Sequence, residues 1–364
     1  MASEIVHEPK YRQVYDALLR QITAGRVGPA GRLPSEAELV QQFGASRITI
    51  ARALRELQLA GLVDRRAGSG TYVRQARASG RPLALGALMP DFGEVEIFGP
   101  ISRGMLEAPD AQSHAIVWPG TGAAGAGREA DAWAGCQQLI ARRVDGVFFA
   151  PLERTPNRVA VNRRIADAFA AARVPVVLVD RSIEPFPQRG RHDLVGLDNR
   201  RAGAIVTSYL LDLDCTRIAF VGEPDAASTV DARQSGYREA LERRGLTATD
   251  DLVLRGDPSD SSLVATLMAR QSPDAIVAAT DRTAGLFMRT VMDLGYRVPS
   301  DVRIVGIDDA EYAGLLPVPL TTLRQPCREI GIAAMAALVE RIAAPDLPAR
   351  DILLHGRLVV RAST

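Results

Sequence analysis

The chain has 364 residues, of which 47% are hydrophobic and 24% charged, and its formal net charge is +1. This composition is ordinary for a soluble globular protein, and the length suits two or three domains. No apolar run reaches the roughly 18 residues of a membrane span, and the polar segment from Met1 to Lys10 lacks the apolar core of a signal peptide. Cys136, Cys215 and Cys327 are too few and too widely spaced for a disulfide framework or a metal knuckle. We therefore expect a cytoplasmic protein with no membrane contact.

Two helices joined by a short turn are predicted near the N-terminus. Ser35 begins the first helix, because Glu38 stands three residues later and the two side chains can form a capping box. This helix runs to Phe43, and Gly44 supplies the turn. Ser46 caps a second, longer helix whose apolar residues recur at helical spacing, namely Ile50, Ala53, Leu54 and Leu57. A helix, a glycine turn and a second helix are the pattern of a helix-turn-helix.

A β-hairpin is predicted to follow these helices. Gly61 suits the left-handed end of the second helix, and residues 62–66 and 71–74 form two short predicted strands around the tip Gly68-Ser69-Gly70. Glycines let the main chain approach a partner closely, and the flanking arginines can neutralise phosphate. The hairpin is therefore predicted to be the wing of a winged helix that touches DNA.

The segment from Tyr11 to Val73 resembles the GntR-type winged helix-turn-helix of bacterial transcription regulators. The motifs that carry the resemblance are Leu33-Pro34-Ser35-Glu36, Ser46-Arg47-Ile48-Thr49, Gly61-Leu62-Val63 and Gly68-Ser69-Gly70-Thr71-Tyr72-Val73. The resemblance implies binding to double-stranded operator DNA through Lys10, Tyr11, Ser35, Glu36, Ser46, Arg47, Ile48, Thr49, Arg52, Gly68, Ser69 and Gly70. Ala37 and Ala51 stand where that family usually carries arginines, so the operator sequence is left open.

The charge is divided unevenly along the chain. Residues 1–80 hold twelve basic and seven acidic residues, an excess of five positive charges, which leaves an excess of four negative charges in the rest. A basic head on a mildly acidic body is typical of a DNA-binding module joined to a domain that does not bind DNA. We predict a DNA-binding domain over residues 1–74, a linker over 75–82 and an effector-binding and dimerisation domain over 83–364.

Short apolar runs alternate with helix-length segments in the large domain. The predicted strands are residues 83–89, 115–118, 146–150, 176–179, 217–221, 252–254, 275–279 and 302–307, and predicted helices include 231–244 and 281–294. Strands that alternate with helices form parallel βαβ units, so we predict an α/β fold with two doubly wound sheets. Ligands of such sheets bind outside the carboxyl ends of the strands.

Polar residues follow several of these strands directly. They are Asp91, Pro151, Asp180-Arg181, Thr280-Asp281 and Asp308-Asp309. Each alone is also typical of a helix cap or a loop. Their repeated position at strand ends favours a shared ligand site.

Residues 82–362 resemble the effector domain of LacI/GalR-type regulators. The motifs include residues 174–181, 198–203, 217–222, 233–237, 305–309 and 319–326. The resemblance implies a two-lobed domain, similar to periplasmic sugar-binding proteins, that the chain crosses three times and that closes on a ligand. It places the ligand contacts at Asp91, Phe98, Asp180, Arg181, Arg233, Thr280, Asp281 and Asp308, with Thr280 where that family commonly has asparagine.

Arginine and aspartate suit a polyol, because a carboxylate accepts hydrogen bonds from two vicinal hydroxyls and a guanidinium donates to two oxygens. An aromatic side chain such as Phe98 or Trp118 can stack on the C–H face of a sugar, although the sequence favours a core position for Trp118. An anionic sugar or a sugar phosphate would also suit the arginines.

Together the two halves are similar to AraR-type, arabinose-responsive repressors. We expect a homodimeric regulator, with no cofactor, that a small sugar or sugar derivative releases from DNA or engages on it. A nucleobase or an amino acid is an alternative effector, because the same fold serves these ligands.

Enzyme functions are disfavoured by the residues present. An aminotransferase that uses pyridoxal phosphate needs a lysine for the Schiff base, and Lys10 in the head is the only lysine. The four histidines lack metal-ligand spacing, and no Gly-x-Ser-x-Gly elbow occurs.

Overall fold

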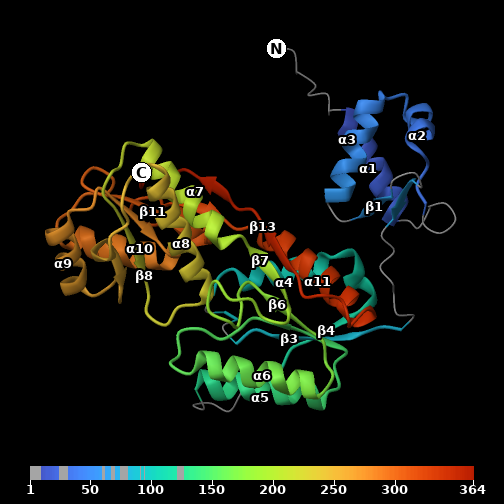
Figure 1. Cartoon of the computed structure of the whole chain (residues 1–364), viewed down its shortest axis with the longest axis horizontal. Helices are drawn as coiled ribbons and strands as arrows, with labels where there is room; N and C mark the ends of the chain where they lie inside the picture. Colours follow the sequence, from blue (N-terminus) through green and yellow to red (C-terminus); the bar gives the residue numbers. More distant parts are fainter. Residues whose placement is uncertain are drawn as a thin grey trace. The chain divides into compact units, whose positions relative to one another are not determined.

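The computed structural model describes residues 10–23, 32–59, 62–66, 70–73, 81–90, 92–93, 95–120 and 127–364. The chain forms two compact units, residues 1–78 and residues 79–364 (Figure 1). No helix among the described residues is long and apolar enough to cross a membrane.

The first unit is a winged helix-turn-helix, as the sequence predicts. Its elements are α1 (Lys10–Thr23), α2 (Glu36–Phe43), α3 (Arg47–Leu59), β1 (Val63–Arg66) and β2 (Gly70–Val73), and the two strands pair antiparallel. The helices bury one apolar core, which includes Val14, Leu18, Leu39, Ile50, Leu54 and Leu57.

The predicted start and stop signals of α2 are confirmed. The Ser35 side chain accepts from the backbone N–H of Glu38, and the Glu38 carboxylate accepts from the backbone N–H of Ser35 at 2.7 Å. Gly44 has a φ of 55°, in the left-handed region that glycine adopts without strain, and it turns the chain into α3.

The second unit contains two six-stranded sheets, one in each lobe. The first-lobe sheet has the order β13-β7-β6-β5-β3-β4, and the second-lobe sheet has the order β14-β12-β11-β10-β8-β9. The first-lobe strands are β3 (Ala84–Leu88), β4 (Ala115–Val117), β5 (Gly146–Phe149), β6 (Val176–Val179), β7 (Asp193–Leu197) and β13 (Asp351–Leu354). The second-lobe strands are β8 (Ile218–Gly222), β9 (Val253–Arg255), β10 (Ala275–Ala278), β11 (Arg303–Asp308), β12 (Thr321–Arg324) and β14 (Arg357–Val359). Within both sheets only β14 pairs antiparallel.

Helices cover both faces of each sheet. In the first lobe α4 (Phe98–Glu107) and α11 (Cys327–Ala343) lie on one face, and α5 (Arg128–Ala141) and α6 (Arg158–Ala171) lie on the other (Figure 1). In the second lobe α7 (Asn199–Asp212) and α8 (Ser228–Arg243) lie opposite α9 (Ser261–Gln271) and α10 (Asp281–Asp293). Short 3-10 turns occur at Pro109–Ser113, Asp250–Leu252 and Glu311–Gly314. The predicted doubly wound α/β fold is confirmed.

Glycines allow α7 and α8 to approach closely. A Cβ atom at Gly203 would clash with the backbone carbonyl of Arg233, and one at Gly236 would clash with that of Arg200. Because α8 carries Arg233, this contact fixes the position of that side chain relative to the second-lobe sheet. The first-lobe pair α4 and α11 has the same arrangement, with clashes for a Cβ at Gly104 or Gly331.

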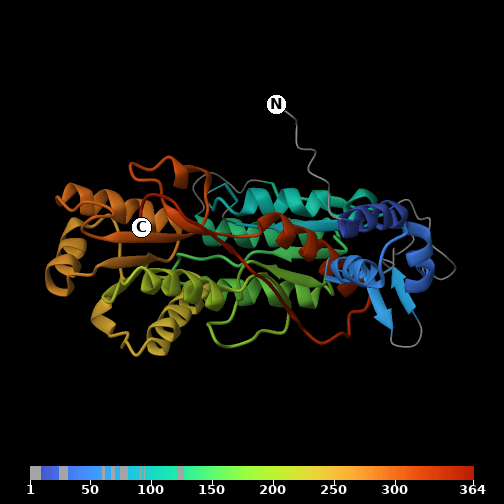
Figure 2. The same cartoon turned by 90° about the horizontal axis from the view of Figure 1, so that it is seen from above.

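The chain crosses between the lobes three times, after β7, after β12 and between β13 and β14. All three crossings lie at the same edge of the two sheets, because β13 and β7 end one sheet order and β14 and β12 end the other. The C-terminal segment passes from one lobe to the other as an extended ribbon (Figure 2). The sequence analysis did not identify β7, β12, β13 or β14, although it found the other strands of both sheets.

Candidate functional site

The start of α3 exposes polar, charged and apolar side chains next to one another. Ser46 and Arg47 are exposed, and the Ile48 side chain is 84% exposed, which is unusual for so apolar a residue. The Ser46 hydroxyl accepts from the backbone N–H of Thr49 at 3.2 Å and lies 2.9 Å from the Thr49 hydroxyl. These contacts fix the start of α3, so the guanidinium and the apolar side chain project from a rigid helix end.

Three of the residues implied as DNA contacts hold the head together. The Arg52 guanidinium lies 3.9 Å from the centre of the Tyr11 ring, a cation–π stack that joins α3 to α1. The Lys10 ammonium donates to the Gly44 carbonyl at 2.9 Å. The positive charges of Lys10 and Arg52 are thus placed beside the helix-turn-helix by contacts within the head.

The other residues implied as DNA contacts lie at the start of α2 and in the hairpin of β1 and β2. Ser35 caps α2, Glu36 is its half-buried first residue, and Gly70 begins β2. Gly68 and Ser69 lie outside the described residues, as does Asp91 of the implied ligand contacts.

In the large unit, Asp180 follows β6 directly, and its two carboxylate oxygens differ in their bonding. Asp180 has a φ of 71°, a strained backbone of the kind that clusters at ligand sites. One carboxylate oxygen accepts from the Arg181 Nε at 2.8 Å. The other oxygen, Oδ1, is buried and has no hydrogen-bond partner among the described residues.

Arg181 is buried between an acid and an aromatic ring. Its guanidinium also pairs with Glu153 at 2.8 Å and lies 5.2 Å from the centre of the Phe98 ring. Burial raises the pKa of the Glu153 carboxyl, but Arg181 and Arg154 outweigh it, so this pKa lies below its ordinary value. Glu153 is therefore an ionised anchor, and it holds Arg181 against the carboxyl edge of the first-lobe sheet.

The second lobe contributes a buried arginine with three partners. Arg233 donates to Asn199 Oδ1 at 2.8 Å and to the Ala279 carbonyl at 2.6 Å, and its Nη2 lies 3.5 Å from Asp308 Oδ1. Asp308 ends β11 with a φ of 138°. Burial raises the pKa of Asp308 and the Arg233 charge opposes that rise.

Gln325 completes this group from the crossing after β12. Its amide nitrogen donates to Asp308 Oδ1 at 2.6 Å. Its carbonyl oxygen, Oε1, is buried and has no hydrogen-bond partner among the described residues. An open acceptor thus belongs to each lobe, Asp180 Oδ1 in the first and Gln325 Oε1 in the second.

Asp281 has a structural role in this arrangement. Its side chain is fully buried, its Oδ1 accepts from the Thr322 hydroxyl at 2.5 Å, and its Oδ2 accepts from the Ala310 N–H at 2.9 Å. The carboxylate therefore joins the segment after β11 to the start of β12. Thr280, half-buried, caps α10 through the backbone N–H of Thr283 at 3.1 Å.

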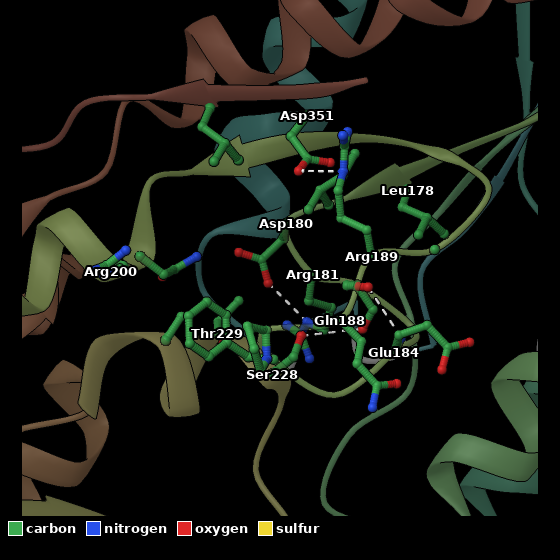
Figure 3. A pocket seen from close by; sticks show the side chains of 18 of the residues that line it. Leu178, Asp180, Arg181, Glu184, Gln188, Arg189, Arg200, Ser228, Thr229 and Asp351 are labelled. Atoms are coloured by element: carbon green, nitrogen blue, oxygen red, sulfur yellow. Dashed lines mark hydrogen bonds and ion pairs between the residues drawn. The ribbon is translucent and has the colours of Figure 1, made fainter. Parts of the chain in front are cut away.

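Two cavities adjoin these residues. One of about 160 Å³ lies between the β6–β7 loop and the starts of α7 and α8, and Asp180, Arg181, Ser228 and Thr229 are among its lining residues (Figure 3). In Figure 3 one Asp180 oxygen bonds Arg181 and the other points away from it. A second cavity, of about 50 Å³, is lined by both lobes, with Val95, Glu96 and Glu153 on one side and Thr280 and Asp308 on the other.

The two lobes also bond directly to each other across the cleft. The Arg154 N–H donates to the Asp225 carbonyl at 2.9 Å, and Arg158 pairs with the Asp225 carboxylate at 2.8 Å. Glu153 accepts from the Ala227 N–H at 3.2 Å. The lobes are therefore closed on each other in this structure.

The sequence analysis missed three polar partners of the cleft, Glu153, Asn199 and Gln325. Asn199 and Gln325 stand inside the quoted motifs, but nothing in their spacing marked them. Glu153 lies two residues after Pro151, whereas the sequence analysis considered only residues that directly follow a predicted strand. A criterion that included the next two or three residues would have found it.

Two family models match the chain. Bacterial regulatory proteins of the gntR family match residues 10–73, and the periplasmic binding protein-like domain matches residues 207–364. The chain is 26% identical over 368 residues to the arabinose metabolism transcriptional repressor of Geobacillus stearothermophilus, covering 98% of each protein. It is 30% identical over 232 residues to the ribose operon repressor of Escherichia coli K12, covering 62% of this chain and 67% of that repressor.

Among solved structures, the transcriptional regulator CelR–cellobiose complex superposes with a TM-score of 0.65 at 24% identity, over 98% of this chain and all of that one. This likeness extends the shared fold over both units.

Proposed function

The chain belongs to the bacterial transcription regulators that join a GntR-type head to a periplasmic-binding-protein-like domain, and from this premise we propose that it is a sugar-responsive repressor without enzymatic activity. A homodimer binds operator DNA through its two heads, and a small sugar or sugar derivative bound between the lobes controls that binding. The curated relatives described above are repressors of arabinose metabolism and of a ribose operon.

The observation that carries the effector proposal is the pair of open acceptors, Asp180 Oδ1 and Gln325 Oε1. Buried polar atoms without partners are rare in folded proteins, and we assign these two, one directly after β6 and one directly after β12, as acceptors for the ligand. Both atoms are acceptors, and a ligand that satisfies them must bring donors. The hydroxyls of a polyol are such donors, and Arg233 and Asp308 beside them can bind further ligand oxygens.

Thr280 completes the proposed ligand contacts as part of the cavity that both lobes line, and Phe98, which is fully buried, backs the Arg181 guanidinium as an apolar wall. We leave Asp281 out of this set, because both of its oxygens are engaged within the second lobe. Arg181 acts on the ligand mainly through Asp180, whose one oxygen it occupies.

On the DNA side, Arg47, Ile48 and Thr49 are proposed to enter the major groove, since they lie at the start of the second helix of the motif. Lys10, Tyr11 and Arg52 supply positive charge and shape beside that helix. Two heads in a dimer would contact half-sites about one helical turn apart.

The switch follows from linkage between the two sites. An effector changes operator affinity only if it binds one state of the dimer better than the other. Lobe closure on the effector provides that difference, because residues of both lobes must reach the same ligand.

The proposal is tested with the full chain in two independent steps. A pool of random DNA duplexes is selected for binding, and enrichment of a two-fold-symmetric sequence is expected. A thermal-shift screen of pentoses, hexoses, sugar acids, sugar phosphates, nucleobases and amino acids then identifies the effector, because a ligand of the folded state raises the melting temperature. A stabilising sugar that changes affinity for the selected duplex supports the proposal. A nucleobase or amino acid as the sole stabilising compound would contradict the sugar assignment.

A further inference from the structure

Two aromatic side chains are exposed at the carboxyl end of the first-lobe sheet. Phe92, which follows β3, is 49% exposed, and Trp118, which follows β4, is 37% exposed. Their ring centres lie 4.8 Å apart and the rings are inclined by 56°. We call this pair the aromatic corner. The sequence analysis favoured a core position for Trp118, and the structure shows that this was wrong.

The backbone of the aromatic corner is held firmly although its rings are exposed. Arg142, at the end of α5, donates to the Trp118 carbonyl at 2.9 Å, and Gln138 on the same helix accepts from the Gly120 N–H at 2.8 Å. Phe92 donates its N–H to the Met89 carbonyl at 3.0 Å. A surface fixed in this way loses little conformational entropy when it binds a partner.

The aromatic corner is connected to the cleft through Val95. Phe92 forms a β-bridge with Val95, and Val95 lines the cavity that Asp308 and Thr280 close from the other lobe. The three crossings lie at the opposite edge of the sheet, so β3 and β4 are the strands of the first lobe farthest from the crossings. Between β6, which Asp180 follows directly, and β3 or β4 there are two or three strand spacings, about 10–14 Å.

We propose that the aromatic corner is a second sugar subsite, and that the effector is a disaccharide or a longer glycoside. One sugar ring occupies the polar group around Asp180, Arg233 and Asp308, and the next ring stacks its C–H face on Phe92 and Trp118. A single ring does not span the distance between the two places, whereas two linked rings do. This inference rests on the proposed function, because it extends the same cleft.

The chemistry of the corner selects a carbohydrate with a free apolar face. Aromatic rings provide contact area without a hydrogen bond, so the hydroxyls at the edge of the stacked sugar stay in water. The inner site then recognises hydroxyl positions, and the outer site recognises the presence of a second ring.

The chain offers its own optical reporter for this test. It has two tryptophans, and the second, Trp133, stacks on Arg164 at 3.7 Å on the helical face of the first lobe. In a Trp133→Phe chain, Trp118 is the single tryptophan. We expect the matched disaccharide to shift and enhance its emission, and the monosaccharide to leave it nearly unchanged.

The binding experiment uses matched pairs, glucose with cellobiose and with maltose, xylose with xylobiose, and galactose with lactose, titrated calorimetrically into the full chain. One disaccharide is expected to bind at least about 10-fold more tightly than its monosaccharide. Trp118→Ala and Phe92→Ala should each remove most of that preference and leave monosaccharide affinity unchanged. Trp118→Phe should retain it, and Trp133→Phe, the matched control, should not alter it. Thermal unfolding checks that each variant is folded.

The outcomes separate this inference from the function on which it rests. Equal affinity for the members of every pair, with silent Trp118 emission and a monosaccharide that controls operator binding, would overturn the aromatic corner alone. A chain that binds no sugar of the panel but responds to a nucleoside would overturn both.

Discussion

Ile48 leads to a quantitative prediction about which base the head reads. The major groove shows a methyl group only at thymine, and apolar side chains contact that methyl. An isoleucine that is 84% exposed, next to Arg47 at the start of α3, is placed for such a contact. We predict that one thymine in each half-site is recognised through its methyl group by Ile48.

The expected magnitude follows from the area removed from water. Burial of one methyl-sized group is worth about 0.8 kcal/mol, which corresponds to about a fourfold change in affinity for each half-site. Removal of the side chain beyond Cβ in Ile48→Ala should cost more, about 1.5–2 kcal/mol of binding free energy per half-site, because three carbons lose their contact. The free energy of unfolding should change by less than about 0.5 kcal/mol, since the side chain packs against little in the free protein.

The assay replaces each thymine of the selected duplex in turn with deoxyuridine, which differs only by the missing methyl. Affinity is measured by fluorescence anisotropy at fixed salt, because protein–DNA affinity depends steeply on salt concentration. The wild-type chain should lose affinity at one thymine per half-site, and Ile48→Ala should be insensitive there. Leu315→Ala is the matched control, since Leu315 is also 84% exposed but lies in the second unit. Uniform tolerance of deoxyuridine, or an unchanged sensitivity in Ile48→Ala, would refute the reasoning.

Three further predictions concern the large unit. Arg233→Ala should abolish the response of operator binding to effector. It should also lower the free energy of unfolding by about 3 kcal/mol, because it leaves Asp308 buried without its cation. A variant that still responds to effector in the operator-binding assay would contradict the pocket assignment. Glu153 has a pKa below its ordinary value in the folded chain, so its stabilisation is present above the unfolded pKa near 4.5 and is lost as the pH falls through the lower folded pKa. Denaturant unfolding of Glu153→Gln from pH 7 to pH 3 should therefore show a smaller loss of stability in acid than the wild-type chain, and equal losses would argue against an ionised anchor. Gly203→Ala should push α7 away from the Arg233 carbonyl, cost about 1–3 kcal/mol in calorimetric stability and weaken effector affinity, whereas alanine at the exposed Gly99 should leave affinity unchanged.

The strands that the sequence pattern revealed are those with continuous apolar runs, such as β5 and β6, whose residues are all buried. The missed strands break that pattern for physical reasons. β12 begins with Thr321 and Thr322, which are fully buried but polar, because hydroxyl hydrogen bonds satisfy them. β13 is an edge strand with alternating exposure, so its few apolar residues do not stand out.

The candidate site was predictable in its location but not in its details. Strand-end polar residues do gather at the facing edges of the two sheets, because parallel strands point the same way. The pattern could not separate Asp308, which lines the cavity between the lobes, from Asp281, whose carboxylate accepts hydrogen bonds from Thr322 and the Ala310 N–H. Nor could it show that Arg52 would stack on Tyr11, since no spacing rule links α1 to α3.

Because all three crossings lie at one edge of the sheets, each lobe can rotate about that edge, and strands far from it move the most. The pivot lies near β13 and β7, and β4 stands five strand spacings from β13, about 24 Å away. A rotation of about 10° around that pivot would move the end of β4 by about 4 Å and the strands at the pivot hardly at all. Trp118, which follows β4, therefore lies where a small angular change gives the largest displacement.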